Sequence, residues 1–199
     1  MTLLTLASTS PARKKILSEA GLDFAILHPG VDEDALVDQH NPSTACDLTL
    51  LLAEAKARAG AAMATTDLVL GCDSALELDG EILGKPLEPA VAIERWKAMR
   101  GRTGVLHSGH HLIDRASGSG LATCTQTTVH FSDISDGQIE AYVATEEPLQ
   151  VAGAFTIDSI GGAYIDRIEG DYHTVVGLSL RALRELTESL GRNYESLWR

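Results

Sequence analysis

Asp73 and Lys85 are the two residues whose types and expected proximity most clearly suggest chemistry. The Asp-Gly pair at 79–80, between apolar segments, predicts a two-residue β-hairpin loop. The expected cross-strand pairs are Leu78 with Glu81, Leu76 with Leu83, and Ser74 with Lys85. This register puts Asp73 beside Lys85, where the carboxylate could bind a metal or accept a proton from water and the lysine could neutralise phosphate charge. A structural ion pair at the hairpin mouth would use the same residues.

A second candidate group lies in the turn between an expected strand at 3–7 and an expected helix that Ser10 caps and Pro11 begins. Basic side chains in the first turns of a helix are disfavoured by its dipole, and an anionic ligand would remove that conflict. Ser8, Ser10, Arg13 and free backbone N–H groups would together form a phosphate site. The alternative is an ordinary serine cap beside a solvated basic face.

Two further features have both a functional and a plain interpretation. The acidic run Asp32-Glu33-Asp34 could hold a hydrated magnesium ion near phosphates, although such a run is also typical of a solvated loop. Lys56, on the helix expected from Asn41 to about Ala62, could reach a cleft, but an isolated lysine is usually a surface residue. The residues themselves leave both choices open.

The remaining elements predict how these residues are positioned. Asp67–Cys72 reads as a buried strand, so Asp73 would follow its carboxyl end, where open α/β sheets bind ligands. The other expected elements are a helix at 89–100, strands at 104–114 and 121–131, a helix from the Ser135/Gln138 capping box to about 144, a strand at 162–168, a loop at 169–172, and a last helix containing Leu180, Leu183, Leu186 and Leu190. Because hairpins accompany the alternating helices and strands, we expect an α/β fold with a mixed, twisted sheet flanked by helices.

Composition narrows the possible partners and the cellular setting. A net charge of −12 disfavours binding to polymeric nucleic acid, which requires a basic surface. Three widely spaced cysteines predict neither a disulfide framework nor a zinc site, and therefore favour a reducing cytoplasm. No apolar run is long enough for a membrane span, so we expect no membrane association.

Taken together, the motifs resemble those of the Maf proteins, nucleoside triphosphate pyrophosphatases related in fold to the inosine triphosphatases. The resemblance covers nearly the whole chain, and its order and spacing are more specific than any single motif. The matching segments are Leu6–Arg13, Asp32-Glu33, Ala53–Ala57 with Lys56, Gly71–Ser74, Leu78–Pro86, Ser108-Gly109, Glu147–Leu149, Ala152-Gly153, Ile168–Tyr172 and Val176–Leu178.

The resemblance implies one Maf-like domain over residues 1–199, with two lobes around a cleft, in a cytoplasmic homodimer that uses Mg²⁺ or Mn²⁺. It implies cleavage of a nucleoside triphosphate to the monophosphate and pyrophosphate. By matching position, Asp73 resembles the catalytic proton acceptor and a metal ligand, and Glu33 resembles an acidic residue beside the metal or phosphates. The residues that resemble the family's phosphate ligands are Ser8, Arg13, Lys56 and Lys85. The two lysines are also assigned to the catalytic group.

Three departures from the family pattern concern base selection. Ala12 replaces the first arginine of the usual Arg-Arg pair, Ser74 replaces the threonine of the pyrimidine-type branch, and Asp158 occupies the position of that branch's glutamine. An acidic residue could accept hydrogen bonds from a guanine-like edge, as in the branch acting on 7-methylguanosine triphosphate, but Ser74 does not match that branch. The preferred base therefore stays open.

Two other functions would use similar residues. A nucleotide-binding regulator of cell division would bind the triphosphate without significant catalysis, whereas a metal-dependent phosphatase would release orthophosphate. Pyrophosphate release separates the leading hypothesis from both.

Overall fold

The computed structural model describes residues 3–199, which divide into two units. Unit 1 contains the chain up to Asp73, Ser108–Thr125 and Gly177–Arg199, and unit 2 contains Ser74–His107 and Gln126–Val176.

The strands are β1 (Leu4–Ala7), β2 (Phe24–Leu27), β3 (Leu68–Leu78), β4 (Glu81–Leu83), β5 (Thr103–Asp114), β6 (Ser119–Phe131) and β7 (Ile165–Gly170). The α-helices are α1 (Pro11–Glu19), α2 (Glu33–His40), α3 (Ala45–Met63), α4 (Pro89–Met99), α5 (Asp136–Val143), α6 (Tyr172–Val176) and α7 (Leu180–Ser189). Four short 3₁₀ helices are η1 (Glu147–Gln150), η2 (Ala152–Ala154), η3 (Ile160–Tyr164) and η4 (Tyr194–Leu197).

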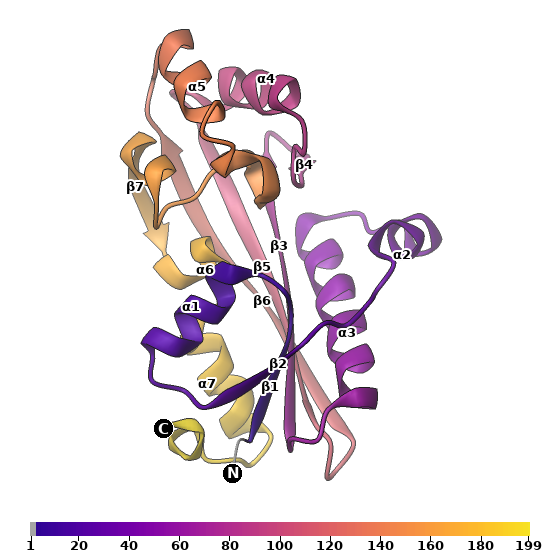
Figure 1. The fold of residues 1–199 in the computed structure, drawn as a ribbon. Helices are drawn as coiled ribbons and strands as arrows, with labels where there is room; N and C mark the ends of the chain where they lie inside the picture. The colour runs from indigo at the N-terminus through magenta and orange to yellow at the C-terminus, as the bar shows by residue number, and fades with distance from the viewer. Residues whose placement is uncertain (1–2) are drawn as a thin grey trace. The chain divides into compact units, whose positions relative to one another are not determined.

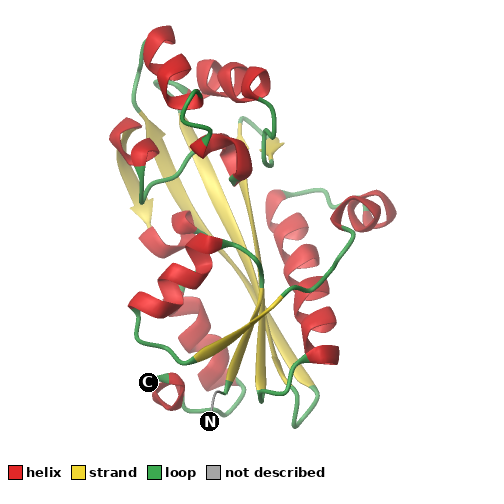
Figure 2. Ribbon diagram, viewed as in Figure 1, coloured by secondary structure: helices red, strands yellow, loops and turns green. Residues whose placement is uncertain are grey.

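The strands belong to one seven-stranded sheet with the order β2-β1-β3-β5-β6-β7, and β4 pairs with β3 outside that path. β1 runs parallel to β2 and β3, whereas the β3–β4 and β6–β7 pairs are antiparallel. Figure 2 shows the helices and strands of this arrangement. The predicted α/β class with a mixed sheet is therefore confirmed.

In unit 1, helices cover both faces of the strands: α1 and α7 lie on one side and α3 on the other (Figure 1). The contact with α3 is unusually close because three glycines supply no side chain. A Cβ on Gly71 of β3 would lie 2.1 Å from the Ala53 carbonyl oxygen, and one on Gly109 of β5 would lie 2.3 Å from the Thr49 oxygen. Within α3 itself, a Cβ on Gly60 would meet the Ala7 Cβ of β1 at 2.7 Å. Backbone contact thus fixes α3 against β3 and β5, and Gly60 lets the helix approach the Ala7 side chain of β1.

Local capping explains where the helices of unit 1 begin. Ser10 caps α1 and Pro11 is its first residue, as predicted. The single helix expected from Asn41 is wrong at its start, because Asn41 adopts a left-handed conformation that ends α2, and Thr44 then caps α3. The acidic run is correspondingly a helix start, with Asp32 as the N-cap of α2. β2 is not among the elements expected from the sequence.

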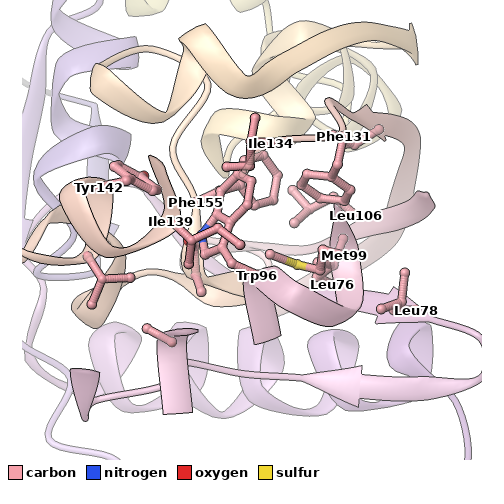
Figure 3. Packing of buried hydrophobic residues seen from close by; sticks show 14 of the residues in the cluster. Leu76, Leu78, Trp96, Met99, Leu106, Phe131, Ile134, Ile139, Tyr142 and Phe155 are labelled. Atoms are coloured by element: carbon pink, nitrogen blue, oxygen red, sulfur yellow. The ribbon is translucent and has the colours of Figure 1, made fainter. Parts of the chain in front are cut away.

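The core of unit 2 is organised around Trp96 of α4 (Figure 3). This side chain is fully buried and donates from its indole N–H to the Ala154 carbonyl at 2.7 Å. The rings of Phe131 and Tyr142 meet it edge-on, at centroid distances of 5.8 and 5.4 Å. Met99, one turn further along α4, is also fully buried.

The end of unit 2 differs from the prediction. The capping box of Ser135 and Gln138 is present at the start of α5. However, β7 continues to Gly170, and α6 begins at Tyr172, so most of the expected 169–172 loop belongs to regular elements. Among residues 3–199, no helix combines the length and apolar character needed to cross a bilayer.

Replacing the Trp96 side chain tests the unit 2 core. We expect Trp96→Ala to lower the free energy of unfolding by about 3–5 kcal/mol, because the substitution removes a large buried ring and leaves a cavity. Trp198→Ala is the matched control, since Trp198 is 55% exposed, and should cost less than about 1 kcal/mol. Urea titration followed by circular dichroism measures both. Equal losses in the two variants would contradict this account of the core.

Adding one methyl group at Gly71 tests the close helix contact. We expect Gly71→Ala to lower the free energy of unfolding by about 3 kcal/mol, because the new Cβ would meet helix backbone atoms at 2.1 and 2.6 Å. Gly137→Ala has nothing within 4 Å of the added Cβ and should be close to neutral. The same urea titration applies, and a Gly71→Ala variant as stable as Gly137→Ala would refute the contact.

Candidate active site

Glu33, Lys56 and Asp73 meet in unit 1. The Lys56 ammonium donates to Asp73 Oδ1 at 2.6 Å and lies 2.9 Å from Glu33 Oε1. The Lys56 and Asp73 side chains are 10% and 14% exposed, whereas that of Glu33 is 47% exposed. One buried cation therefore joins two carboxylates from separate elements.

The close packing of α3 accounts for the buried part of this group. Gly71 and Asp73 lie two residues apart in β3, so their positions share one face of the strand. Gly71 faces the backbone of α3 at Ala53 and Ala57, and Lys56 is the residue before Ala57. This places the lysine beside the aspartate. Asp73 lies inside β3, which continues to Leu78, rather than after the end of the strand as expected.

Glu33 reaches the site from a different kind of element. It is the first residue of α2, whose N-cap Asp32 accepts a hydrogen bond from the Ala35 N–H at 3.1 Å. The helix buries none of its residues. The cap thus sets the position of Glu33, and the ion pair with Lys56 joins it to the buried part of the site.

Arg13 and the two predicted serines form a second group in unit 1. Arg13 is only 8% exposed, and its Nε donates to the Gly177 carbonyl at 2.8 Å. Its Nη1 donates to the Cys72 carbonyl at 2.8 Å and to Ser8 Oγ at 3.3 Å. Ser8 Oγ also accepts from the Ser10 N–H at 3.2 Å. These contacts order the turn after β1, and the predicted binding of phosphate by Ser8, Ser10 and Arg13 stays a prediction.

The Cys72 thiol, which lies between these two groups in the site, is unreactive. Burial raises the pKa of Cys72 to about 12, although the positive charges of Arg13 and Lys56 act in the opposite direction. The thiolate form is therefore scarce at neutral pH, and Cys72 offers no nucleophile to the site.

Lys85 belongs to unit 2, where it is exposed after β4. The predicted hairpin register is confirmed from Leu76↔Leu83 to Leu78↔Glu81. The expected pair of Ser74 with Lys85 does not form in the strand ladder, because β4 ends at Leu83. The following segment turns to other partners: the Gly84 carbonyl accepts from the Gly153 N–H, and the Leu87 N–H donates to the Leu149 carbonyl. A role of Lys85 beside Asp73 remains a prediction.

The three positions predicted to select the base are divided between the units. Ala12 is partly exposed on α1 in unit 1. Ser74 and Asp158 belong to unit 2, where both are partly exposed; Ser74 lies in β3 and Asp158 in the segment between η2 and η3. Their roles in specificity also remain predictions.

The segment that carries Asp158 is held by Glu147, a residue to which sequence reasoning assigned no role. One Glu147 carboxylate oxygen accepts from the Thr156 hydroxyl at 2.5 Å and the Gly161 N–H at 2.9 Å. The same oxygen accepts from the Tyr142 hydroxyl at 3.0 Å. Glu147 was visible in the sequence only as part of a Glu-Pro motif, because its partners lie up to 14 residues away.

These contacts change the acidity of Glu147. Burial by itself would raise its pKa, but hydrogen bonds from the Thr156 hydroxyl and the Gly161 N–H, with others from Ser159 and Ile160, lower the pKa from 4.5 to about 2. A carboxyl group whose pKa is lower in the folded than in the unfolded state stabilises the fold at pH values above the pKa of the unfolded state. This stabilisation is lost as the pH falls through the pKa of the folded state. The contribution of Glu147 is therefore complete above about pH 4.5 and disappears toward pH 2.

Glu147→Gln tests this contribution. At pH 7 we expect a loss of about 1–3 kcal/mol in the free energy of unfolding, because an amide accepts these hydrogen bonds more weakly than a carboxylate. The difference from the unsubstituted protein should shrink between about pH 4.5 and pH 2. Urea titrations over this pH range provide the measurement, with Glu140→Gln, at an exposed position of α5, as the control. A difference that does not vary with pH would contradict the assignment.

The donor chemistry of the site suits a hard divalent cation. Among residues 3–199 there is no group of three or more His, Cys, Asp or Glu side chains that could hold a metal ion. Mg²⁺, however, commonly uses only one or two protein carboxylates, together with water and substrate phosphates. Glu33 and Asp73 already converge on one cationic atom, the Lys56 ammonium, and supply oxygen ligands of the required type.

Comparison with known proteins gives a consistent result. Proteins named nucleoside triphosphate pyrophosphatase from Salinispora tropica and Streptomyces coelicolor are 50% and 49% identical to this chain, each over 98% of it, covering 87% and 94% of the respective relatives. One of the same name from Microcystis aeruginosa is 44% identical over 98% of both chains. The family model described as Maf-like protein matches residues 3–190. The chain therefore belongs to the Maf family.

Proposed function

We propose that this protein hydrolyses a nucleoside triphosphate to the monophosphate and pyrophosphate. The observation that carries the proposal is the meeting of Glu33, Lys56 and Asp73, which combines a carboxylate able to accept a proton, a buried cation and oxygen donors for a metal. The proposal is supported by the names of relatives that are 44–50% identical over nearly the full chain.

In the proposed reaction, water attacks the α-phosphorus and the bond from that phosphorus to the α,β-bridging oxygen breaks. Asp73 accepts the proton from water, and pyrophosphate leaves with the bridging oxygen. Lys56 and Lys85 offset negative charge on the phosphates, while Ser8 and Ser10 donate hydrogen bonds to them. Mg²⁺ or Mn²⁺, when bound by Asp73 and Glu33, would neutralise phosphate charge and orient the triphosphate.

The Lys56 contact bears directly on the role of Asp73. The Lys56 ammonium donates to one oxygen of the Asp73 carboxylate at 2.6 Å and thereby fixes the orientation of that carboxylate. The same ammonium would lie near the phosphates of a substrate bound beside Asp73. We therefore assign Lys56 to charge neutralisation and to orientation of the base.

Product analysis tests the reaction. The purified protein is incubated with Mg²⁺ or Mn²⁺ and a panel of triphosphates that includes dTTP, UTP, GTP and 7-methylguanosine triphosphate. We expect monophosphate and pyrophosphate in equal amounts from some members of the panel. Diphosphate with orthophosphate would indicate a phosphatase, and binding without turnover would indicate a nucleotide-binding regulator, so either result contradicts the proposal.

The same panel examines base selection at Ala12, Ser74 and Asp158. We propose that these positions adjust which base is accepted, because they are the points at which the chain departs from the family pattern. An acidic Asp158 would favour a base edge that donates hydrogen bonds, as a guanine-like edge does. Asp158→Gln should then shift the ratio of kcat/KM values from purine toward pyrimidine triphosphates.

We further propose that the protein acts as a homodimer in the cytoplasm, in line with the family resemblance. Its three cysteines are free, as suits a reducing compartment. The net charge of −12 supports a small-molecule substrate over a nucleic acid polymer. Sedimentation analysis determines the oligomeric state.

Asp73→Asn tests the proposed general base. We expect kcat to fall by about 100- to 10,000-fold, because an amide cannot accept the proton from water, whereas the fold and triphosphate binding should persist. Asp67→Asn is the matched control in the same unit, since Asp67 is a half-exposed aspartate just before β3. Pyrophosphate release under saturating substrate measures the effect. A near-normal rate in Asp73→Asn would exclude the assigned role.

A further inference from the structure

Arg13 is connected to Asp73 through the backbone of β3. Its Nη1 donates to the carbonyl of Cys72, the residue immediately before Asp73. We propose that Arg13 is a positioning residue for Asp73, which it acts on through this carbonyl, and that its main contribution is not phosphate binding. The inference rests on the proposed function only for the catalytic importance of Asp73.

The need for such an anchor follows from the strand pairing. The described register between β1 and β3 ends at Leu6↔Leu70, and β1 itself ends at Ala7. Cys72 lies two residues beyond the last pair, where β1 no longer supplies backbone partners. Arg13, on the helix that follows β1, donates to the Cys72 carbonyl instead. The guanidinium thus extends the lateral support of β3 as far as the catalytic position.

The same side chain joins two other segments. Its Nε donates to the carbonyl of Gly177, just before the last long helix, and its Nη1 also contacts Ser8 in the turn after β1. Three segments distant in sequence are therefore joined by one planar group. Because a guanidinium presents its N–H donors in a fixed planar fork, the relative positions of the three segments are tightly constrained.

Asp73 is consequently held from two sides of the strand. Lys56 approaches its carboxylate from α3, and Arg13 supports the preceding carbonyl from α1; these helices lie on opposite sides of the unit 1 strands (Figure 1). Arg13 is only 8% exposed, and at least two of its nitrogens donate to protein oxygens in this arrangement. Its geometry is that of an internal brace, not of a cation presented to solvent.

Arg13→Lys separates positioning from phosphate binding. A lysine keeps the charge but cannot reproduce the fork, so Asp73 should lose alignment while the electrostatic attraction for phosphate persists. We expect kcat to fall about 10- to 100-fold with KM changed less than about threefold, because small displacements of a catalytic group cost that much rate. Hydrogen exchange in the peptide covering residues 70–76 should accelerate at least about fivefold, as expected when a local anchor is lost.

Arg115→Lys is the matched control, because Arg115 also donates from Nε and Nη1 to two backbone carbonyls of unit 1, those of Ala61 and Thr66. It should leave kcat, KM and exchange at 70–76 unchanged, even if it lowers the melting temperature. Arg13→Gln, which introduces no ammonium group, replaces Arg13→Lys if the lysine variant does not fold. The same exchange and kinetic criteria then apply.

A raised KM with normal kcat and normal exchange would overturn the proposal and assign Arg13 to phosphate binding. Equal effects of Arg13→Lys and Arg115→Lys on kcat would also overturn it, since the loss would then follow general destabilisation. If the unsubstituted protein releases no pyrophosphate, the proposed function fails, and the exchange measurement still decides the anchoring. Faster exchange at 70–76 supports it, and unchanged exchange refutes it.

Discussion

Helix α3 lies so close to β3 and β5 that its backbone occupies the space where side chains of these strands would otherwise stand, and it also packs closely on Ala7 of β1. Glycine at positions 71 and 109 of the strands, and at position 60 of the helix, makes this approach possible. Such contact leaves little freedom for the helix to rotate or slide, because tightly packed interiors resist displacement. The position of Lys56 next to Asp73 follows from this packing, as does the burial that makes their ion pair more than a surface contact.

Burial of Lys56 also determines the electrostatic character of the site. A buried ammonium needs compensation, and Asp73 and Glu33 supply it in the structure. A triphosphate brings its own negative charge and, with a divalent cation, changes the partners available to each of these groups. The Lys56 ammonium and the two carboxylates can therefore exchange partners without leaving an isolated buried charge. Such an arrangement suits a substrate that arrives with a metal.

The sequence was informative where structure depends on nearby residues. The Asp-Gly turn specified the β3–β4 register, and Ser10 and Ser135 marked two helix starts, because turns and caps depend on only a few adjacent residues. The partners of Lys56 and Arg13 could not be found this way. Lys56 lies 17 residues from Asp73, and Arg13 lies 59 residues from Cys72, so only tertiary packing brings them together. Resemblance to a family indicated that Lys56 mattered, but not which groups it contacts.

Because α2 is weakly attached, the carboxylates of Glu33 and Asp73 are not held equally firmly. Asp73 belongs to a buried strand, whereas Glu33 begins a helix that buries no residue and ends at the left-handed Asn41. Elements with few buried contacts open at low free energy, independently of the rest of a domain. Detachment of α2 would release Glu33 from Lys56 while Asp73 and Lys56 kept their positions. The two carboxylates thus differ in the free energy needed to displace them, and Glu33 is the more easily displaced of the two.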